Sequence, residues 1–296
     1  MMYIHGAMWY NNENKNGVTE MRTEFLNIAI HDDGELESIL RGKIAAREKL
    51  HHWPLSYVEK VTMADGRTLV YKSQNADSSV EREFYAREKV KESPFITEII
   101  YAETLEGCDV MIMPYLENPP LDVTDISGEE FDKIISDVSA QIQTLGDIPV
   151  YFDISTHGKL SALTDSVCDI FLPDDVAVLM KWVAEKARGC YENQTIGNVH
   201  GDLSASNILT KDGKMRTIID WQRPMKAPVM LENAIARLLL KSNGDAKRAA
   251  AEQNEFDKLA ILVHFIWYSH AYKTCLPLNG VIAQAKRLLA EIAAAV

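Results

Sequence analysis

Two carboxylates and one carboxamide of this chain have the types and the spacing that phosphoryl transfer requires. Asp202 and Asn207 belong to the run His-Gly-Asp-Leu-Ser-Ala-Ser-Asn at 200–207, and Asp220 ends the run Ile-Ile-Asp at 218–220. Transfer from ATP needs a carboxylate near the attacking hydroxyl group, oxygen ligands for Mg²⁺ and a cation on the phosphates. The pattern therefore indicates phosphoryl transfer from ATP to a hydroxyl group, with Mg²⁺ as the metal ion.

A hairpin is the element that we expect to bring these side chains together. The apolar segments 207–210 and 215–219 flank the turn sequence Lys-Asp-Gly-Lys at 211–214, a pattern that predicts two antiparallel strands. The hairpin would return Asp220 to the loop that holds Asp202 and Asn207. Each residue alone has an ordinary structural role, but the combination at this spacing favours a catalytic site.

The run Val-His-Gly-Asp-Leu-Ser-Ala-Ser-Asn-Ile-Leu at 199–209, followed by Ile-Ile-Asp-Trp at 218–221, resembles the aminoglycoside phosphotransferase and choline kinase superfamily. The resemblance implies an α+β, protein-kinase-like fold with two lobes, a small antiparallel β-rich N-lobe and a larger, mainly helical C-lobe. It also implies that Asp202 is the catalytic base or orients the acceptor hydroxyl, and that His200 braces the loop. By the same resemblance, Asn207 and Asp220 hold Mg²⁺. The similarity spans about residues 50–245, with its specific motifs at 199–221.

The N-terminal half contains a matching candidate for the phosphate-binding cation. Strand-like segments at 57–61 and 68–72 flank the turn Ala-Asp-Gly-Arg at 64–67, which predicts a hairpin that ends on Lys72. The resemblance implies that Lys72 contacts the nucleotide phosphates. A helix is expected over 80–90, with a serine at 78 or 79 as its N-cap. Glu83 on this helix is the preferred partner of Lys72, and Glu81 is the alternative, because the sequence does not fix which glutamate faces inward.

A second hairpin is predicted from the segments 96–105 and 109–113, which meet at a Glu-Gly turn at 106–107. The proline-containing exit after it is the expected lobe boundary, and the resemblance implies that Met113 and Tyr115 belong to a hinge that binds the nucleotide. We expect three parts: an N-terminal extension at 1–30, a nucleotide-binding N-lobe at 31–117, and a helical catalytic and substrate C-lobe at 118–296.

Apolar residues recur at helical spacing in the second lobe, which predicts helices over 131–145, 176–187, 231–240, 256–272 and 281–294. The aromatic run Phe-Ile-Trp-Tyr at 265–268, with Tyr272 beyond it, is typical of a core stripe. A cage for an ammonium group, formed by cation–π contacts, is the alternative.

Two departures from the superfamily pattern affect the functional prediction. The segment 47–58, where a nucleotide-covering loop is expected, contains no glycine, although backbone amides approach phosphates most closely where side chains are absent. A catalytically inactive, kinase-like nucleotide-binding or interaction module is therefore the alternative function. Gly201 and the run Gln-Arg-Pro at 222–224 replace the Arg and the Phe-Gly of protein kinases, which argues against a protein kinase.

Composition narrows the partners further. The chain has 31 basic and 43 acidic residues and a formal charge of −12, which disfavours nucleic acid as a partner. The acidity would favour a cationic small-molecule acceptor, but an ordinary acidic protein surface explains it equally well. The four cysteines lie far apart, so neither a zinc site nor a disulfide framework is expected. The sequence also shows neither a secretory leader nor a membrane span, and we expect a cytoplasmic protein without a membrane partner.

Overall fold

The computed structural model describes residues 28–53, 55–124, 126–171, 174–212, 214–242 and 254–272. The chain divides into two compact units. The first, here called the sheet unit, comprises Met1–Pro119 and Leu209–Gln222, and the second, the helical unit, comprises Pro120–Ile208 and Arg223–Val296. The predicted N-terminal extension, up to residue 27, and the predicted helix over 281–294 lie outside the described residues.

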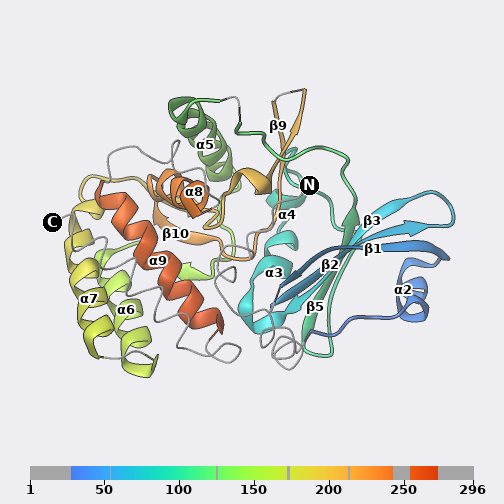
Figure 1. Cartoon of the computed structure of the whole chain (residues 1–296), viewed down its shortest axis with the longest axis horizontal. Coiled ribbons are helices and arrows are strands. Elements are labelled where there is room, and N and C mark those ends of the chain that lie inside the picture. Colours follow the sequence, from blue (N-terminus) through green and yellow to red (C-terminus); the bar gives the residue numbers. More distant parts are fainter. Residues whose placement is uncertain are drawn as a thin grey trace. The chain divides into compact units, whose positions relative to one another are not determined.

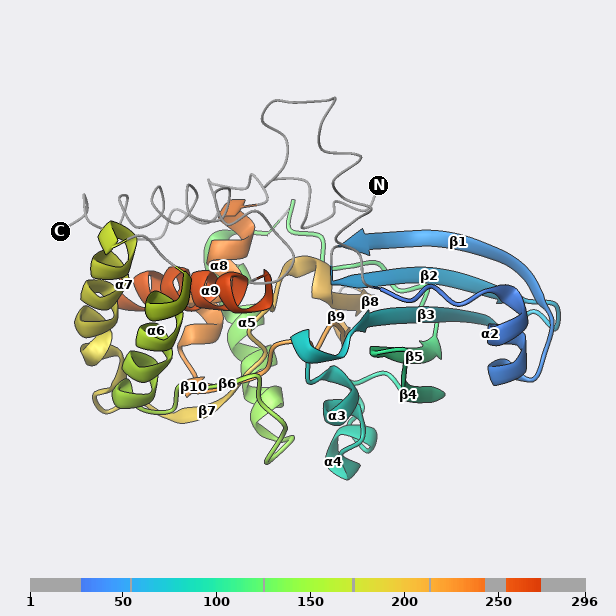
Figure 2. The ribbon, with the colours of Figure 1, turned by 90° about the horizontal axis from the view of Figure 1, so that it is seen from below.

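Five antiparallel strands form the main sheet of the sheet unit, in the order β1-β2-β3-β5-β4. Figure 2 shows them side by side. The hairpins predicted around 64–67 and 106–107 are confirmed, although the strand predicted over 96–105 begins only at Tyr101. Their turns contain residues in left-handed conformations, Gly66 with φ 89°, Glu106 with φ 52° and Gly107 with φ 77°. The strands are β1 (Ile44–Trp53), β2 (Ser56–Met63), β3 (Thr68–Asn75), β4 (Tyr101–Leu105) and β5 (Cys108–Pro114).

Helix α2 (Asp33–Leu40) covers one face of this sheet. It begins with a capping box, in which the Asp32 side chain accepts the N–H of Glu35 and the Glu35 side chain accepts the N–H of Asp32. Buried residues of α2 and of the strands form one apolar cluster, which includes Leu36, Val61 and Tyr71. Because side chains alternate along a strand, Lys72, next to Tyr71, lies on the opposite face of β3.

The helix predicted over 80–90 is wrong as one element, because two short helices occur there, α3 (Glu81–Tyr85) and α4 (Glu88–Lys91). The chain leaves helical geometry at Arg87, with φ −74° and ψ 134°. Phe84 and Val90 are both fully buried, and six residues apart they would lie on different faces of one continuous helix. The break allows both side chains to reach the core.

The hairpin expected around 211–214 is also confirmed. Strands β8 (Ile208–Lys211) and β9 (Lys214–Ile218) form a two-stranded sheet, and an isolated parallel bridge joins Ile218 to Ile96. The N–H of Ile218 donates to the Phe95 carbonyl at 2.9 Å. This anchoring fixes the end of β9, two residues before Asp220, within the sheet unit.

The helical unit confirms the predicted change from strands to helices (Figure 1). Its helices are α5 (Gly128–Gln143), α6 (His157–Phe171), α7 (Asp174–Lys186), α8 (Leu231–Ser242) and α9 (Glu255–Tyr272). Helix α6 is the one that the apolar spacing did not predict. A small sheet, in the order β6-β10-β7, is built from β6 (Phe152–Asp153), β10 (Met225–Pro228) and β7 (Ile196–Val199). Among the described residues, no helix combines the length and the apolar character needed to cross a bilayer.

Candidate active site

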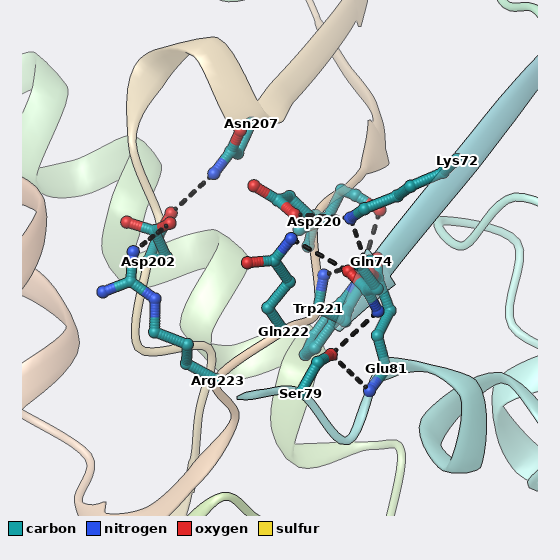
Figure 3. Close-up of polar contacts among 11 residues, drawn as sticks. Lys72, Gln74, Ser79, Glu81, Asp202, Asn207, Asp220, Trp221, Gln222 and Arg223 are labelled. Carbon is teal, nitrogen blue, oxygen red and sulfur yellow. Dashed lines mark hydrogen bonds and ion pairs between the residues drawn. The ribbon is translucent and has the colours of Figure 1, made fainter. Parts of the chain in front are cut away.

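In the sheet unit, one ammonium group bridges two carboxylates (Figure 3). Nζ of Lys72 lies 2.5 Å from Oε2 of Glu81 and 2.8 Å from Oδ1 of Asp220. The preferred pairing of Lys72 with Glu83 is therefore wrong, and the alternative, Glu81, is the partner. Glu81 is buried and Glu83 is exposed, because residues two apart on a helix point to nearly opposite sides.

Charge distribution in this cluster favours a cationic Lys72. Burial opposes the ammonium form, but the nearby carboxylates of Asp220 and Glu81 outweigh burial and raise the pKa of Lys72. The Lys72 and Glu81 side chains are almost fully buried, whereas the Asp220 side chain is 32% exposed. One positive charge thus faces two carboxylates, and the more exposed carboxylate, Asp220, is placed to meet a further cation.

The backbone at Asp220 has an unusual conformation that its neighbours hold. Its φ is 69°, in the left-handed region, which residues other than glycine adopt at a cost of about 1–2 kcal/mol. The next residue, Trp221, donates its backbone N–H to Oε1 of Glu81 at 3.1 Å and its indole N–H to the Ile218 carbonyl at 3.2 Å. Its ring stacks on Phe84, with centroids 4.2 Å apart. Glu81 therefore holds both Lys72 and the backbone that presents Asp220.

Three further polar side chains extend this network, and sequence reasoning did not assign them a place in the site. Nε2 of Gln222 donates to Oε1 of Gln74 at 3.0 Å, and Nε2 of Gln74 donates to the Ser79 hydroxyl at 2.9 Å. The same hydroxyl accepts the N–H of Glu81 at 3.0 Å. The chain of bonds ties the segment after Asp220 to strand β3 and to the start of α3.

Met113 and Tyr115 lie at the end of β5 and just beyond it. Met113 is opposite Val70 in the sheet, so it shares the face of Lys72, two residues from Val70. The N–H of Tyr115 donates to the Thr68 carbonyl at 2.9 Å, and its ring lies 4.4 Å from Nζ of Lys60. This face therefore carries an apolar strip with a cation at each end, an arrangement that suits a nucleotide base and its phosphates.

The segment expected to cover the nucleotide is a tight hairpin. β1 and β2 pair as far as Trp53 and Ser56, so only two residues, 54 and 55, connect them. Leu55 is buried, and its carbonyl accepts the N–H of Asn75 at 2.9 Å. A glycine-rich loop that wraps a phosphate is thus replaced by a short connection that is bonded to the end of β3.

In the helical unit, the loop at 200–207 is held from within. The N–H of Asp202 donates to Nδ1 of His200 at 3.2 Å, and Nδ2 of Asn207 donates to the Asp202 carbonyl at 2.8 Å. All three side chains are at least nine-tenths buried. His200 therefore accepts this bond through an unprotonated Nδ1 and is held within the loop.

Gly201 is required at its position for two reasons. Its φ is 81°, and a Cβ atom there would lie 2.3 Å from the carbonyl oxygen of Arg223. A side chain at 201 would therefore be strained and would clash with backbone. The arginine that protein kinases carry at this point of the motif does not fit this chain.

A buried glutamate lies behind the loop and was not predicted. Glu232, in the first turn of α8, is fully buried, and its Oε2 accepts the N–H of His200 at 2.5 Å. Burial raises the pKa of Glu232 to about 8, the N–H groups of His200 and Gly201 oppose the rise, and the charge of Asp202 adds to it. The sequence gives little indication that Glu232 is buried. Acidic residues are common in the first turn of a helix, where they interact favourably with the helix dipole.

The Asp202 carboxylate has a cationic partner in the same unit. Nη2 of Arg223 lies 2.8 Å from Oδ2 of Asp202, as Figure 3 shows. The guanidinium carbon also lies 3.2 Å from the ring centroid of Trp267. Phe265 and Trp267 are both buried, so these two members of the aromatic run form core contacts. The side chains of Tyr268 and Tyr272 are not among those that the structure describes.

Asp220 in the sheet unit and Asn207 in the helical unit each offer a side-chain oxygen of the kind that binds Mg²⁺. The Asp220 carboxylate is partly exposed, and Asn207 uses its NH₂ group in the bond to Asp202, which leaves its carboxamide oxygen as the donor atom for a metal. Both are hard oxygen ligands, which Mg²⁺ prefers. Within the described part of the chain, no three His, Cys, Asp or Glu side chains form a metal-binding group.

Similarity to known proteins agrees with this geometry. The model of the phosphotransferase enzyme family matches residues 70–260, more than half of the 296 residues. A comparison with curated protein sequences returned no match.

Solved structures of kinases share the fold. A thermostable mutant of aminoglycoside phosphotransferase APH(4)-Ia, in a ternary complex with ADP and hygromycin B, has 14% identity and a TM-score of 0.60, over 88% of this chain and 97% of that chain. Macrolide 2'-phosphotransferase MphH from Brachybacterium faecium has 11% identity and a TM-score of 0.56, over 84% and 95%. Amicoumacin kinase hAmiN, in complex with AMP-PNP, Ca²⁺ and Ami, has 11% identity and a TM-score of 0.56, over 88% and 92%.

These matches confirm the predicted fold class, superfamily and enzyme class. The match over 70–260 includes Lys72, Glu81 and Asp220 of the first cluster and the loop at 200–207 with Arg223 and Glu232. The chain belongs to the phosphotransferase enzyme family.

Proposed function

We propose that this protein transfers the γ-phosphoryl group of ATP to a hydroxyl group of a small molecule. The observation that supports this most is the contact of one buried ammonium, that of Lys72, with both Glu81 and Asp220. A kinase-like site needs its lysine–glutamate pair and its metal-binding aspartate in place together. Similar folds occur in complexes with ADP and with AMP-PNP, which supports an adenine nucleotide as the donor.

The nucleotide would bind on the face of the sheet that carries Lys72. Lys72 contacts the phosphates, while Met113 and Tyr115 at the end of β5 contact the base. Lys60, whose ammonium lies over the Tyr115 ring, belongs to the same face and adds a positive charge at its edge. Consumption of ATP also agrees with the cytoplasmic location that we expect.

Asp220 and Asn207 would hold Mg²⁺ through their side-chain oxygens. The metal ion supplies charge neutralisation for the phosphates when it is bound. Lys72 restrains the Asp220 carboxylate through its 2.8 Å contact, and the bond from Asn207 to the Asp202 carbonyl restrains the carboxamide. Both ligands are thus oriented by contacts within their own units.

Asp202 is the residue that would accept the proton of the acceptor hydroxyl or orient that hydroxyl for attack. His200 and Glu232 act on it through the loop backbone, since His200 accepts the N–H of Asp202 and Glu232 accepts the N–H of His200. A carboxylate of this kind typically contributes about 10²- to 10⁴-fold in rate. The acceptor is proposed to be an aminoglycoside-, choline- or amino-sugar-like hydroxyl compound, as the acidic charge of −12 would suit.

A second function is favoured by one observation, the tight hairpin that joins β1 to β2 without a glycine. A protein that keeps the fold but grips ATP weakly could serve as a nucleotide-binding or interaction module. The buried Lys72–Glu81 pair argues for the enzyme, because such a pair is costly to desolvate and its retention suggests use.

Two measurements separate these functions. A thermal-shift titration with ATP and MgCl₂ should stabilise the protein, since a ligand at a hundred times its dissociation constant contributes about 2.7 kcal/mol. A panel of hydroxyl compounds with γ-labelled ATP should then yield a phosphorylated product. Nucleotide binding without product from any compound would favour the inactive module. No nucleotide binding at all would contradict the enzyme and the nucleotide-binding form of the module.

A further inference from the structure

One guanidinium group is enclosed by two cation-binding partners beside Asp202. Arg223 places Nη2 at 2.8 Å from Oδ2 of Asp202 and its guanidinium carbon at 3.2 Å from the ring centroid of Trp267. The three residues are 7%, 5% and 3% exposed. A carboxylate and the face of an indole ring are the two groups with which proteins most readily hold organic cations. The chain therefore fills a cation subsite with its own side chain.

The backbone around Arg223 fixes the guanidinium in this place. The Arg223 carbonyl packs against Gly201, where a Cβ atom would lie 2.3 Å away, and the carbonyl of Pro224 accepts the N–H of Tyr151 at 2.7 Å. Strand β10 begins at Met225, directly after this bond. With its backbone pinned on both sides, Arg223 has little freedom to leave the subsite.

Apolar side chains surround the stacked pair. A small cavity of about 10 Å³ next to Arg223 and Trp267 is lined mostly by apolar side chains, among them Phe152, Ile235 and Val263, together with His264. Electrostatic interactions are strengthened in such a setting, where water screens charges poorly. A second cation brought against Asp202 would therefore be repelled by the guanidinium and would find the ring already covered.

We propose that Arg223 is a specificity-determining residue that positions Asp202 and excludes ammonium groups from its immediate neighbourhood. The acceptor would then present a hydroxyl flanked by neutral groups, and any amine that it carries would lie away from the reacting end. The inference rests on the proposed function, because it takes Asp202 as the residue that faces the acceptor hydroxyl. The overall charge suggested a cationic acceptor, and the inference narrows this class to acceptors whose positive charge lies away from the reacting hydroxyl.

Removing the arginine should open the subsite to small cations. In Arg223→Ala, guanidinium chloride at millimolar concentration, with NaCl at equal ionic strength as the reference, is expected to stabilise the protein in a thermal-shift titration. Ethanolammonium should do the same and ethylene glycol should not. The wild type should respond to none of these probes. The double variant Arg223→Ala/Trp267→Leu should lose at least half of the shift, because it lacks the ring.

Rescue of kcat by added guanidinium would separate a role in positioning Asp202 from a purely structural role. Arg223→Ala should lower kcat by about 10²-fold, the usual effect of a misplaced reacting group, with an unchanged KM for ATP. Added guanidinium should raise the kcat of Arg223→Ala by at least about 10-fold. Arg237→Ala is the matched control, since the Arg237 side chain is only 13% exposed and is likewise paired with carboxylates, those of Asp132 and Asp257. Guanidinium should not raise the kcat of this variant. Arg223→Lys should keep the exclusion of ethanolammonium.

The outcomes are separable from those of the proposed function, because cation binding is measured without turnover. Cation binding by the wild type equal to that of Arg223→Ala would overturn the inference even if the protein proves to be a kinase. Cation binding gained only by the variant supports it. Should Arg223→Ala fail to fold, Arg223→Met, which keeps the apolar stem, provides the same comparison. An acceptor with an amine next to its phosphorylated hydroxyl would also overturn it.

Discussion

Oδ1 of Asp220 lies 2.8 Å from Nζ of Lys72, across 148 residues of sequence. The proposed metal ligand and the proposed phosphate ligand thus contact each other within the sheet unit. Because Glu81 also binds Lys72, the ammonium is oriented from two sides. The cluster carries a net negative charge, which would favour the entry of Mg²⁺ together with a nucleotide rather than of a nucleotide alone.

Lys72→Met tests this coupling of charge and stability. The change leaves the buried Glu81 carboxylate without its cation, and breaking a buried pair on one side typically costs about 3–5 kcal/mol. The double variant Lys72→Met/Glu81→Gln should regain most of that free energy of unfolding, yet neither variant should bind ATP normally. Chemical denaturation of the wild type, both single variants and the double variant measures the interaction. Strict additivity of the two changes would show that the pair is not coupled.

Glu81 and Glu83 form a natural pair of variants for the helix face. Glu81→Gln should lower kcat/KM for ATP by at least about 10-fold, since the neutral amide holds Lys72 less firmly. Glu83→Gln, on the exposed side of the same short helix, should remain within about threefold of the wild type. Steady-state kinetics with varied ATP gives both values, and a larger loss from the change at 83 would reverse the assignment.

Glu232 should make stability depend on pH in a particular direction. Its pKa is about 8 in the folded protein against an ordinary value of 4.5, so the folded state binds the proton more tightly. The contribution is fully present below about pH 4.5 and is lost as the pH rises through about 8, with a total on the order of a few kcal/mol. Glu232→Gln cannot ionise and should be the more stable protein at pH 9.

Denaturant unfolding at pH 5, 7 and 9 measures this effect. The difference in the free energy of unfolding, wild type minus Glu232→Gln, should fall steadily across the series. A constant difference would mean that Glu232 has the same protonation in the folded and the unfolded protein across this range, so that folding does not raise its pKa.

Gly201 and Gly66 separate backbone strain from steric clash. Both have positive φ, 81° and 89°, but a Cβ atom at 66 would have no heavy atom within 4 Å, whereas one at 201 would meet the Arg223 carbonyl. Gly66→Ala should cost about 1–2 kcal/mol from strain alone. Gly201→Ala should cost about 1–3 kcal/mol more and should also lower kcat, because the loop that holds Asp202 must shift. Equal costs in thermal unfolding would exclude the clash.

The loop at 200–207 was predictable because its chemistry is local. Asp202, Asn207 and the hairpin that leads to Asp220 lie within about twenty residues, and turn signals mark both ends of the hairpin. The two-lobed fold followed from the resemblance carried by these residues and from the change in apolar spacing after the proline-containing exit.

Other parts of the site depend on contacts that sequence spacing does not encode. The choice between Glu81 and Glu83 depends on where a five-residue helix begins, and the break at Arg87 follows from the burial of both Phe84 and Val90. Arg223 and Glu232 belong to the site because the fold brings β10, α8 and the loop of His200 together. Each has an ionisable side chain that is buried, which is rare, but the sequence does not show burial, which depends on how these elements pack.

The most direct test of the central claim is a comparison of Asp202→Asn with the wild type in γ-phosphoryl transfer. With the acceptor found in the panel of hydroxyl compounds, the wild type should form product, and Asp202→Asn should lose about 10²- to 10⁴-fold in kcat while its affinity for Mg²⁺-ATP, measured by titration calorimetry, stays the same. An Asp202→Asn protein that turns over at the wild-type rate would contradict the assignment of Asp202 as the residue that activates the acceptor.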